Sequence, residues 1–355
     1  MKIALEVSSY SNKNLSGISR YMLRLMEQYE RNYSNYNFKY LQKYFKKNKE
    51  KLPDFVLDNS VDYMGKLWPL EKYDIVHGLD GRRYPIRSKV TVTSIHDLLI
   101  FHETENRIAS DHFIVKKQKQ FKDAARNSDA VITISEYSRQ DISKRLGVSM
   151  DKIFVTYLGI EPKFKPTSKQ CVIELKAKYA LPEDYLLFVG GISARKNTER
   201  MVCAHAEIVR ESGVPLVLAG EISYDGEKTL EVIRKLGVEK SVFQIGYVDD
   251  EDLPALYSGA IGLVFPTLLE GFGFPILESM ACGTPVLVSD YGASPEVGRK
   301  YVITCSPLDI ESIADGMKKL INSKKYFSTD AIEYAQGYTW EKCSASTLDV
   351  YNRLL

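Results

Sequence analysis

The chain has 355 residues, of which 44% are hydrophobic and 26% are charged. This length is greater than one hydrophobic core usually supports, so we expect two domains. The composition is that of an ordinary soluble globular protein, and no apolar run approaches the length that spans a bilayer, which argues against a membrane-spanning protein.

Charge is divided unevenly along the chain. Residues 1–165 contain 29 Lys and Arg against 20 Asp and Glu, a net charge of +9, whereas residues 166–355 contain 19 against 26, a net charge of −7. A basic first half suggests an anionic partner. Its most basic stretch, residues 43–51, interleaves lysines with aromatic residues. This stretch is either a solvated surface helix or a contact with an anionic membrane surface.

The five cysteines are odd in number and scattered, so they form neither a disulfide framework nor a zinc-binding spacing. Residues 1–7 have the pattern of a strand interrupted by Glu6, and not that of a secretion signal. We therefore expect a cytoplasmic protein, with the inner face of the cytoplasmic membrane as the alternative location.

Strand and helix patterns alternate along the chain, which predicts parallel sheets covered by helices. A helix beginning near Ile18 carries an apolar stripe that continues to Tyr29. Two prolines interrupt regular structure in residues 161–168, which marks a connector between domains. In the first half we expect strands near residues 2–7, 73–77, 90–95, 130–134 and 153–156.

The second half repeats the alternation, with a capping-box arrangement at Ser306 and Asp309 before its last expected helix. We expect strands near residues 185–189, 215–219, 242–245, 261–265, 285–289 and 301–303. We expect helices near residues 197–211, 229–236, 276–282 and 308–322. The chain is therefore predicted to be an α/β protein with two Rossmann-type domains and a ligand in the cleft between them.

The most informative segment is Glu270-Gly-Phe-Gly-Phe-Pro-Ile-Leu-Glu278, which follows an apolar strand and opens a helix. Backbone N–H groups of Gly271, Phe272 and Gly273 would form an anion site at the helix N-terminus. Glu278, expected in the first turn, would accept hydrogen bonds from two ribose hydroxyls, and Glu270 would reach the sugar being transferred. The alternative is two acidic residues that merely favour the start of a helix. Two carboxylates beside an anion site fit a sugar nucleotide.

A second loop, residues 188–197, ends the first strand of the second domain. Asn197 is a candidate N-cap of the next helix, and Arg195 and Lys196 project beside that helix start. A diphosphate needs cations that stay charged, which these two side chains supply. Adjacent basic residues are often only surface residues, but a glycine pair at a strand end favours phosphate binding.

The first domain offers weaker candidates. Gly17 lies between the first strand and the first helix, where it would let the backbone approach a phosphate. His96 follows the strand at residues 90–95 and could hydrogen-bond a hexose or orient an acceptor hydroxyl. His77, at another strand end, is weaker still. The acidic run at residues 249–252 resembles the start of a helix more than a metal site.

With these residues in place, the chain resembles the retaining glycosyltransferases of family 4. The resemblance extends over nearly the whole length, and the Glu270–Glu278 motif is its most specific part. The other segments that carry it are the Gly17 loop, His96-Asp97 and residues 134–139, 157–160, 190–197, 246–248 and 339–341. Gly191 and Leu158 depart from the usual pattern, in which arginine and asparagine are common. The Arg-Lys-Asn order at 195–197 is similar to that of bacterial mannosyltransferases of surface polysaccharide synthesis.

The resemblance implies a GT-B fold, in which two Rossmann-like parallel-sheet domains face each other across a donor-binding cleft. It implies an N-terminal acceptor-side domain at residues 1–165 and a nucleotide-sugar domain at residues 166–338. A last segment, residues 339–355, would be a helix that packs back on the N-terminal domain. The implied donor-binding residues are Gly17, Arg195, Lys196, Tyr247, Val248, Gly271, Phe272, Gly273 and Glu278. The implied catalytic residues, beside the reacting sugar, are His96 and Glu270.

The implied reaction is transfer of a hexosyl group, with retention of anomeric configuration, to a hydroxyl of a surface polysaccharide or lipid-linked glycan. GDP-mannose is the first choice of donor, and a UDP-sugar or dTDP-sugar is the second. We expect no metal or other cofactor and no nucleic-acid partner, while peripheral membrane association would involve the basic first half. A sugar-nucleotide epimerase and a non-catalytic nucleotide-sugar binder are the alternatives of other classes.

Overall fold

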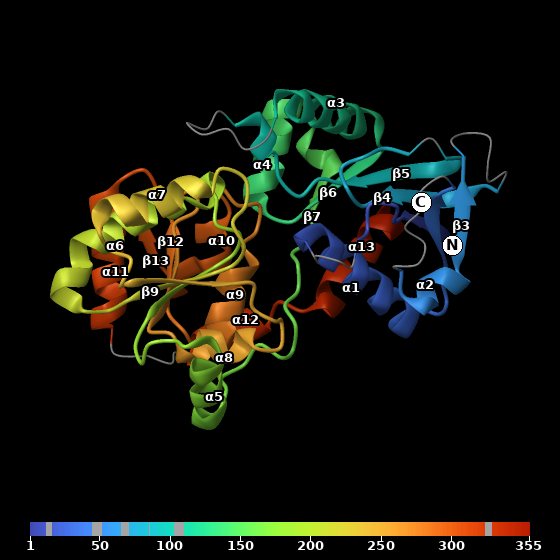
Figure 1. Ribbon diagram of the computed structural model, residues 1–355. Helices are drawn as coiled ribbons and strands as arrows, with labels where there is room; N and C mark the ends of the chain where they lie inside the picture. Colours follow the sequence, from blue (N-terminus) through green and yellow to red (C-terminus); the bar gives the residue numbers. More distant parts are fainter. Residues whose placement is uncertain (12–15, 45–51, 65–70, 85, 103–109, 324–328) are drawn as a thin grey trace. The chain divides into compact units, whose positions relative to one another are not determined.

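The computed structural model describes residues 1–11, 16–44, 52–64, 71–84, 86–102, 110–323 and 329–355. These residues form two compact domains (Figure 1). The N-terminal domain comprises Met1–Phe101, Asp111–Gly159 and Thr339–Leu355, and the C-terminal domain is formed mainly by Ile160–Tyr338. The long C-terminal-domain segment begins at Ile160, directly after Gly159 and ahead of both prolines of the expected connector.

The N-terminal domain contains a seven-stranded parallel sheet with the strand order β3-β2-β1-β4-β5-β6-β7. Its strands are β1 (Lys2–Glu6), β2 (Asn37–Lys43), β3 (Ser60–Tyr63), β4 (Tyr73–Gly78), β5 (Ser88–Ser94), β6 (Ala130–Thr133) and β7 (Ile153–Val155). One face of the sheet is covered by α1 (Gly17–Asn32) and α13 (Trp340–Leu354), and the other by α3 (Asp111–Asn127) and α4 (Glu136–Leu146), as Figure 1 shows. A short helix, α2 (Asp54–Asp58), precedes β3.

Helix α1 forms where the apolar stripe predicts it. Ser16 is its N-cap, and its hydroxyl accepts a hydrogen bond of 3.2 Å from the Ser19 backbone N–H. Ile18 is 40% exposed, so the buried stripe begins one turn later than expected. The buried apolar residues of α1 are Tyr21, Met22, Leu25, Met26 and Tyr29.

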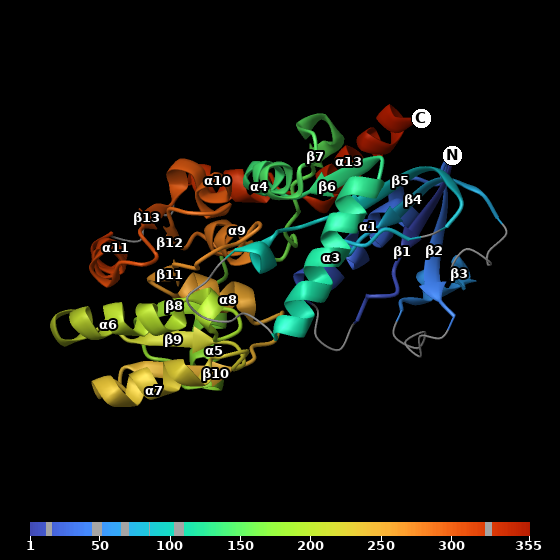
Figure 2. The same ribbon diagram turned by 90° about the horizontal axis from the view of Figure 1, so that it is seen from above.

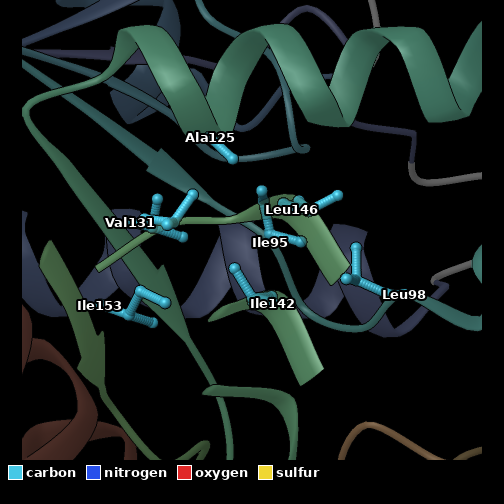
Figure 3. Close-up of a cluster of buried hydrophobic side chains, with 8 residues drawn as sticks. Ile95, Leu98, Ala125, Val131, Ile142, Leu146 and Ile153 are labelled. Carbon is cyan, nitrogen blue, oxygen red and sulfur yellow. The ribbon is translucent and has the colours of Figure 1, made fainter. Parts of the chain in front are cut away.

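A cluster of aliphatic side chains packs between the sheet and helices α3 and α4 (Figure 3). Its members are Ile95, Leu98, Ala125, Val131, Ile142, Leu146, Val148 and Ile153. Ile95 and Leu98 are at most 1% exposed and lie on either side of His96 in the sequence. Burial of both anchors therefore fixes the loop that carries His96.

The last helix of the chain, α13, belongs to the N-terminal domain and packs beside α1 (Figures 1 and 2). Gln28 of α1 donates a hydrogen bond of 3.3 Å to Glu341 of α13. A Cβ atom at Gly159 would lie 2.3 Å from the Trp340 backbone nitrogen, so only glycine permits this close approach at the start of the helix. The final residues thus complete the core of the domain in which the chain begins.

The C-terminal domain contains a six-stranded parallel sheet with the order β10-β9-β8-β11-β12-β13. Its strands are β8 (Leu186–Val189), β9 (Leu216–Ala219), β10 (Val242–Gly246), β11 (Gly262–Phe265), β12 (Val286–Ser289) and β13 (Ile303–Cys305). Helices α6 (Thr198–Ser212), α7 (Glu227–Leu236) and α11 (Ile310–Asn322) pack side by side on one face. The remaining helices are α5 (Lys169–Tyr179), α8 (Leu253–Gly259), α9 (Phe274–Ala281), α10 (Ser294–Gly298) and α12 (Thr329–Gln336).

The predicted α/β class with two Rossmann-like parallel-sheet domains is confirmed. Two N-terminal strands, β2 and β3, were not predicted, because polar residues interrupt their apolar pattern. The capping box expected at Ser306 is wrong. Helix α11 begins at Ile310, and the Asp309 carboxylate caps it by accepting a hydrogen bond of 3.1 Å from the Glu311 N–H.

The basic stretch predicted at residues 43–51 falls largely outside the described residues. Lys43, its first residue, is the last residue of β2 and is exposed, and Tyr44 is 57% exposed. Residues 45–51 are not described. Among the helices that the structure does describe, none is both long and apolar enough to cross a membrane.

Candidate active site

The two predicted motifs of the C-terminal domain meet at one edge of its sheet. Strands β8 and β11 are parallel neighbours, so the loops that leave their carboxyl ends lie side by side. The Leu268 N–H donates a hydrogen bond of 3.2 Å to the Arg195 carbonyl oxygen. The Asn197 amide donates a hydrogen bond of 2.9 Å to the Pro266 carbonyl oxygen. The loop at residues 188–197, the candidate phosphate loop, and the loop that carries Glu270 are therefore joined by hydrogen bonds.

Glu270 lies between the two basic residues of the phosphate loop. Its Oε1 accepts a hydrogen bond of 3.1 Å from Arg195 Nη1 and one of 2.8 Å from Lys196 Nζ. The side chains of Glu270 and Lys196 are 11% and 12% exposed, whereas Arg195 is 35% exposed. Burial raises the pKa of Glu270, but Lys196 and Arg195 outweigh it and hold the pKa below the ordinary value. The carboxylate is therefore ionised and shared by two cations.

The backbone and an aromatic ring hold this ion cluster in place. The Glu270 carbonyl oxygen accepts a hydrogen bond of 3.2 Å from the Ala293 N–H, in the loop after β12. Lys196 Nζ lies 4.8 Å from the centroid of the Phe265 ring. Gly190 has φ +143°, and its carbonyl oxygen would lie 2.0 Å from a Cβ atom at Gly220. Glycine at both positions lets the loops after β8 and β9 pass this closely.

Asn197 occupies the expected N-cap position of α6, but its side chain does not cap the helix. Its Nδ2 group instead donates hydrogen bonds of 2.9 Å to the Pro266 oxygen and 2.6 Å to the Pro307 oxygen. The residue is 2% exposed and adopts φ +60°, a conformation that asparagine tolerates better than most residues. Asn197 therefore ties together the loops after β8, β11 and β13.

Helix α9 begins at Phe274, two residues earlier than expected, with Gly273 as its N-cap at φ +93°. Glu278 consequently lies in the second turn of the helix, and the expectation of a first-turn position is wrong. The Phe272 ring is 3% exposed and packs edge-on against Phe274 and Tyr338, with centroids 5.7 and 6.0 Å away. The side chain of Phe272 thus anchors the loop, which leaves its backbone N–H as the group that a ligand would contact.

Glu278 is 3% exposed, and its Oε2 accepts a hydrogen bond of 2.8 Å from the Tyr257 hydroxyl. Tyr257 comes from α8 and is fully buried. The sequence pattern identifies Tyr257 only as part of the apolar face of a helix, so it gives no signal for this contact. A ligand diol at Glu278 would share the carboxylate with Tyr257.

Tyr247 and Val248 follow β10, at the edge of the sheet, with β9 between β10 and β8. Tyr247 is 64% exposed, whereas Val248 is 5% exposed. Of these two side chains, only that of Tyr247 is therefore accessible to the base of a nucleotide. The acidic run beyond them is engaged in ion pairs, since Asp252 Oδ2 lies 2.6 Å from Lys178 Nζ and Glu251 Oε1 lies 2.8 Å from Lys163 Nζ.

The N-terminal domain carries Gly17 and His96. Gly17 is the first residue of α1 and is exposed. His96 follows β5, and its Nε2 is buried without a hydrogen-bond partner among the described residues. Burial lowers the pKa of His96 to about 4, against an opposing effect of Asp80, so the imidazole is neutral at neutral pH. His77, in contrast, is fully buried with both ring nitrogens engaged.

Two family models match consecutive segments of the chain. Residues 41–164 match the model described as Glycosyltransferase Family 4, and residues 173–337 match the model described as Glycosyl transferases group 1. The first segment falls almost entirely in the N-terminal domain and the second in the C-terminal domain. The two matches together cover most of the chain.

Individual proteins agree with the family models. O-antigen chain mannosyltransferase B of Escherichia coli is 28% identical over an alignment of 298 residues, and the match covers 81% of this chain and 77% of that protein. Sucrose-phosphate synthase of Thermosynechococcus elongatus has a similar structure, with a TM-score of 0.78 at 18% identity, over 100% of this chain and 99% of that one. Anabaena HepE, solved with UDP-glucose, has a TM-score of 0.73 at 17% identity, over 99% and 100%. The two solved structures show likeness of fold.

Proposed function

We propose that this chain, which belongs to the family 4 glycosyltransferases and has their GT-B fold, transfers a hexosyl group from a nucleoside-diphosphate sugar to a glycan hydroxyl. The observation that carries the proposal is the cluster of Glu270, Arg195 and Lys196. Two cations beside a helix N-terminus fit a diphosphate, and a carboxylate among them fits a sugar hydroxyl.

Donor binding would change the partners of the two cations. In the structure, one carboxylate, Glu270, accepts hydrogen bonds from both Arg195 and Lys196. A diphosphate carries more negative charge than one carboxylate and also accepts hydrogen bonds from the Gly271–Gly273 N–H groups. The cations would then hold the diphosphate, and Glu270 would accept hydrogen bonds from the sugar hydroxyls. Glu278 would bind the ribose, with Tyr247 beside the base.

The same groups would stabilise the leaving group. As the bond between the anomeric carbon and the phosphate oxygen breaks, negative charge develops on the nucleoside diphosphate. Fixed cations can stabilise this charge, so we propose a metal-independent reaction. The acceptor oxygen attacks from the face that the diphosphate leaves, and its proton passes to the departing phosphate oxygen. The configuration of the sugar is then retained, and Glu270 acts without forming a covalent bond.

His96 would orient the acceptor hydroxyl. Its imidazole is neutral at neutral pH, and its buried Nε2 has no hydrogen-bond partner among the described residues. A buried polar atom without a partner is unfavourable, which an acceptor hydroxyl would relieve. We therefore assign His96 to binding and orientation of the acceptor, while the diphosphate takes up the proton.

GDP-mannose is the proposed donor. The Escherichia coli relative acts as a mannosyltransferase on the O-antigen chain by its name, and the Arg195-Lys196-Asn197 order supports the same choice. The test is a thermal-shift panel of GDP, UDP, dTDP and their sugars, followed by transfer assays with the donors that stabilise the protein. GDP and GDP-mannose should give the largest shifts. A response to UDP or dTDP alone would assign the donor to the second choice.

The proposed acceptor is a hydroxyl of a surface polysaccharide, of the O-antigen class that the name of the relative indicates. Such acceptors are often lipid-linked, and one helix of the basic domain suits a membrane surface. Helix α3 buries only two of its residues, Ala124 and Ala125. Its exposed side chains include Val115, at 64%, together with Lys116, Lys119, Lys122 and Arg126. A basic face with an apolar residue fits an anionic lipid surface.

A further inference from the structure

Four buried polar side chains form a hydrogen-bonded network through the core of the N-terminal domain. The Tyr351 hydroxyl of α13 lies 2.5 Å from His77 Nδ1, and His77 Nε2 lies 2.8 Å from the Ser94 hydroxyl. The same Ser94 hydroxyl lies 2.9 Å from the hydroxyl of Tyr21, on α1. None of the four residues is more than 1% exposed. This hydrogen-bonded network therefore joins α13, β4, β5 and α1 inside one domain.

One end of this hydrogen-bonded network, Tyr21, lies against His96. The Tyr21 ring meets the His96 ring edge-on, with a centroid distance of 4.7 Å and an interplanar angle of 84°. Tyr21 is thus held at both ends, by Ser94 at its hydroxyl and by His96 at its ring. Any displacement of the Tyr21 hydroxyl would also move or tilt the ring that packs on His96.

The packing of the core alone does not explain why four polar side chains form this network. Burying an imidazole and three hydroxyls costs free energy unless each group has a partner, and apolar side chains would fill the same volume without that cost. Each of the four groups depends on its neighbours, so the arrangement is satisfied only when all are present. A buried polar network of this kind fixes a single arrangement of the surrounding side chains.

We propose that Tyr351, His77 and Ser94 are positioning residues, which hold the Tyr21 ring against His96 and so keep the His96 imidazole oriented and its Nε2 atom buried. The importance of His96 for transfer rests on the function proposed above, whereas the coupling itself does not. The last helix of the chain thereby helps to order a candidate site residue that lies 255 positions earlier than Tyr351 in the sequence.

The surroundings of His96 offer a readout of this coupling. Burial lowers the pKa of His96 to about 4, and Asp80 is the charged group that raises it. The other titratable neighbours are His77, whose pKa burial lowers to about 3 with a contribution from His96, and Tyr21, whose pKa burial raises. Both remain neutral between pH 4 and 8, whereas Asp80, which forms an ion pair of 2.9 Å with Arg82, is a charged group that acts on His96. If the His96 ring tilts and water reaches its Nε2 atom, the pKa of His96 should rise towards the ordinary value of 6.5.

The test is NMR titration of the full chain, labelled at the histidine Cε1 positions, in Tyr351→Phe and Ser94→Ala. The chain has five histidines, so the signals can be assigned by single substitutions. Tyr40→Phe is the matched control. The Tyr40 hydroxyl donates a hydrogen bond of 2.8 Å to Glu30 in the same domain, but it is not part of the Tyr351–His77–Ser94–Tyr21 network. We expect the His96 midpoint to rise by about one pH unit in both variants and to stay unchanged in the control.

Transfer kinetics give the second readout. We expect kcat to fall about tenfold in Tyr351→Phe and Ser94→Ala, with the donor KM unchanged, because a misoriented group slows the chemical step more than it weakens donor binding. An unchanged His96 midpoint in whichever of the two variants folds would overturn the inference. A shifted midpoint with normal kcat would support the coupling and instead refute the role of His96 in transfer.

Discussion

Glu270 and Lys196 are joined by a hydrogen bond of 2.8 Å, although the sequence assigns them to different parts of the donor. Arg195 binds the same carboxylate oxygen at 3.1 Å. The carboxylate thus keeps the two cations together, and we expect it to compete with the diphosphate for them. The carboxylate therefore fixes the position of the two cations, and we expect it to lower the affinity for the donor.

This competition predicts opposite effects of Glu270→Gln on binding and on turnover. Without the carboxylate, Arg195 and Lys196 would bind a diphosphate more tightly, so we expect the Kd for GDP to fall severalfold. Transfer should fall at least about 100-fold, because the sugar loses its charged partner. Calorimetry and a transfer assay measure the two effects. Glu251→Gln, which breaks an exposed ion pair with Lys163, is the control and should change neither.

The ion cluster also predicts how stability depends on pH. The pKa of Glu270 in the folded protein lies below its ordinary value of 4.5, since its cations outweigh burial. The ionised carboxylate therefore stabilises the fold above about pH 4.5, and this contribution is lost as the pH falls through the lower, folded-state value. Thermal unfolding between pH 3 and 7 should show a steeper acid loss of Tm in the wild type than in Glu270→Gln. Parallel curves would contradict this assignment.

Tyr257→Phe tests the contact that supports Glu278. Loss of the hydroxyl leaves a buried carboxylate oxygen without this donor, which costs about 1–3 kcal/mol. Tyr185→Phe removes a similar buried hydrogen bond, to the Leu256 carbonyl oxygen of the same helix, and serves as the control. Both variants should lose stability in urea, but only Tyr257→Phe should raise the donor KM. Equal donor KM values would show that Tyr257 acts on the fold alone.

The close passage of two loops predicts a difference between two glycines. Gly220→Ala would place a Cβ atom 2.0 Å from the Gly190 carbonyl oxygen, and the phosphate loop would have to move. Gly213 also has positive φ, +66°, but a Cβ atom there meets nothing within 4 Å. We expect Gly213→Ala to cost about 1–2 kcal/mol in urea unfolding, and Gly220→Ala to cost more and to weaken GDP binding. Equal GDP affinity in both variants would contradict this account of the loop.

Helix α3 makes membrane association testable. Replacing Lys116 and Lys119 with Glu reverses two charges on its exposed face, and replacing Lys235 and Lys240, on the C-terminal domain, makes the same change in net charge. Only the α3 variant should lose binding to vesicles that contain phosphatidylglycerol, and wild-type binding should weaken as salt rises. If the wild type does not bind these vesicles at low salt, or if the two variants bind them equally, α3 is not the membrane contact.

The parts of this protein that sequence could predict are those set by local pattern and parallel topology. Because parallel strands end at one edge, the loops at Arg195 and Glu270 could be placed together before any contact was known. Strand β2 was not predicted, because Asn37–Lys43 mixes polar and apolar residues and so lacks a continuous apolar pattern. Local sequence carries no sign of the Tyr257–Glu278 or Tyr351–His77 contacts, which join residues from separate elements.

Backbone geometry accounts for the other differences. The positive φ of Gly273 starts α9 earlier than the position of Pro275 suggests, which moves Glu278 into the second turn. Asn197 has the residue type of an N-cap, yet two carbonyl oxygens from distant loops take its amide group. The first difference is set by the local conformation of Gly273, and the second by tertiary contacts of Asn197.

The anomeric configuration of the product tests most directly whether this protein is a retaining glycosyltransferase. The donor selected by the thermal-shift panel, labelled at its anomeric carbon, is incubated with a glycan acceptor, and the one-bond carbon–proton coupling of the new linkage is recorded. We predict a glycosidic product with the same configuration as the donor, formed by the wild type and absent with Lys196→Ala. An inverted linkage, or a changed free nucleotide sugar without transfer to the acceptor, would contradict the account.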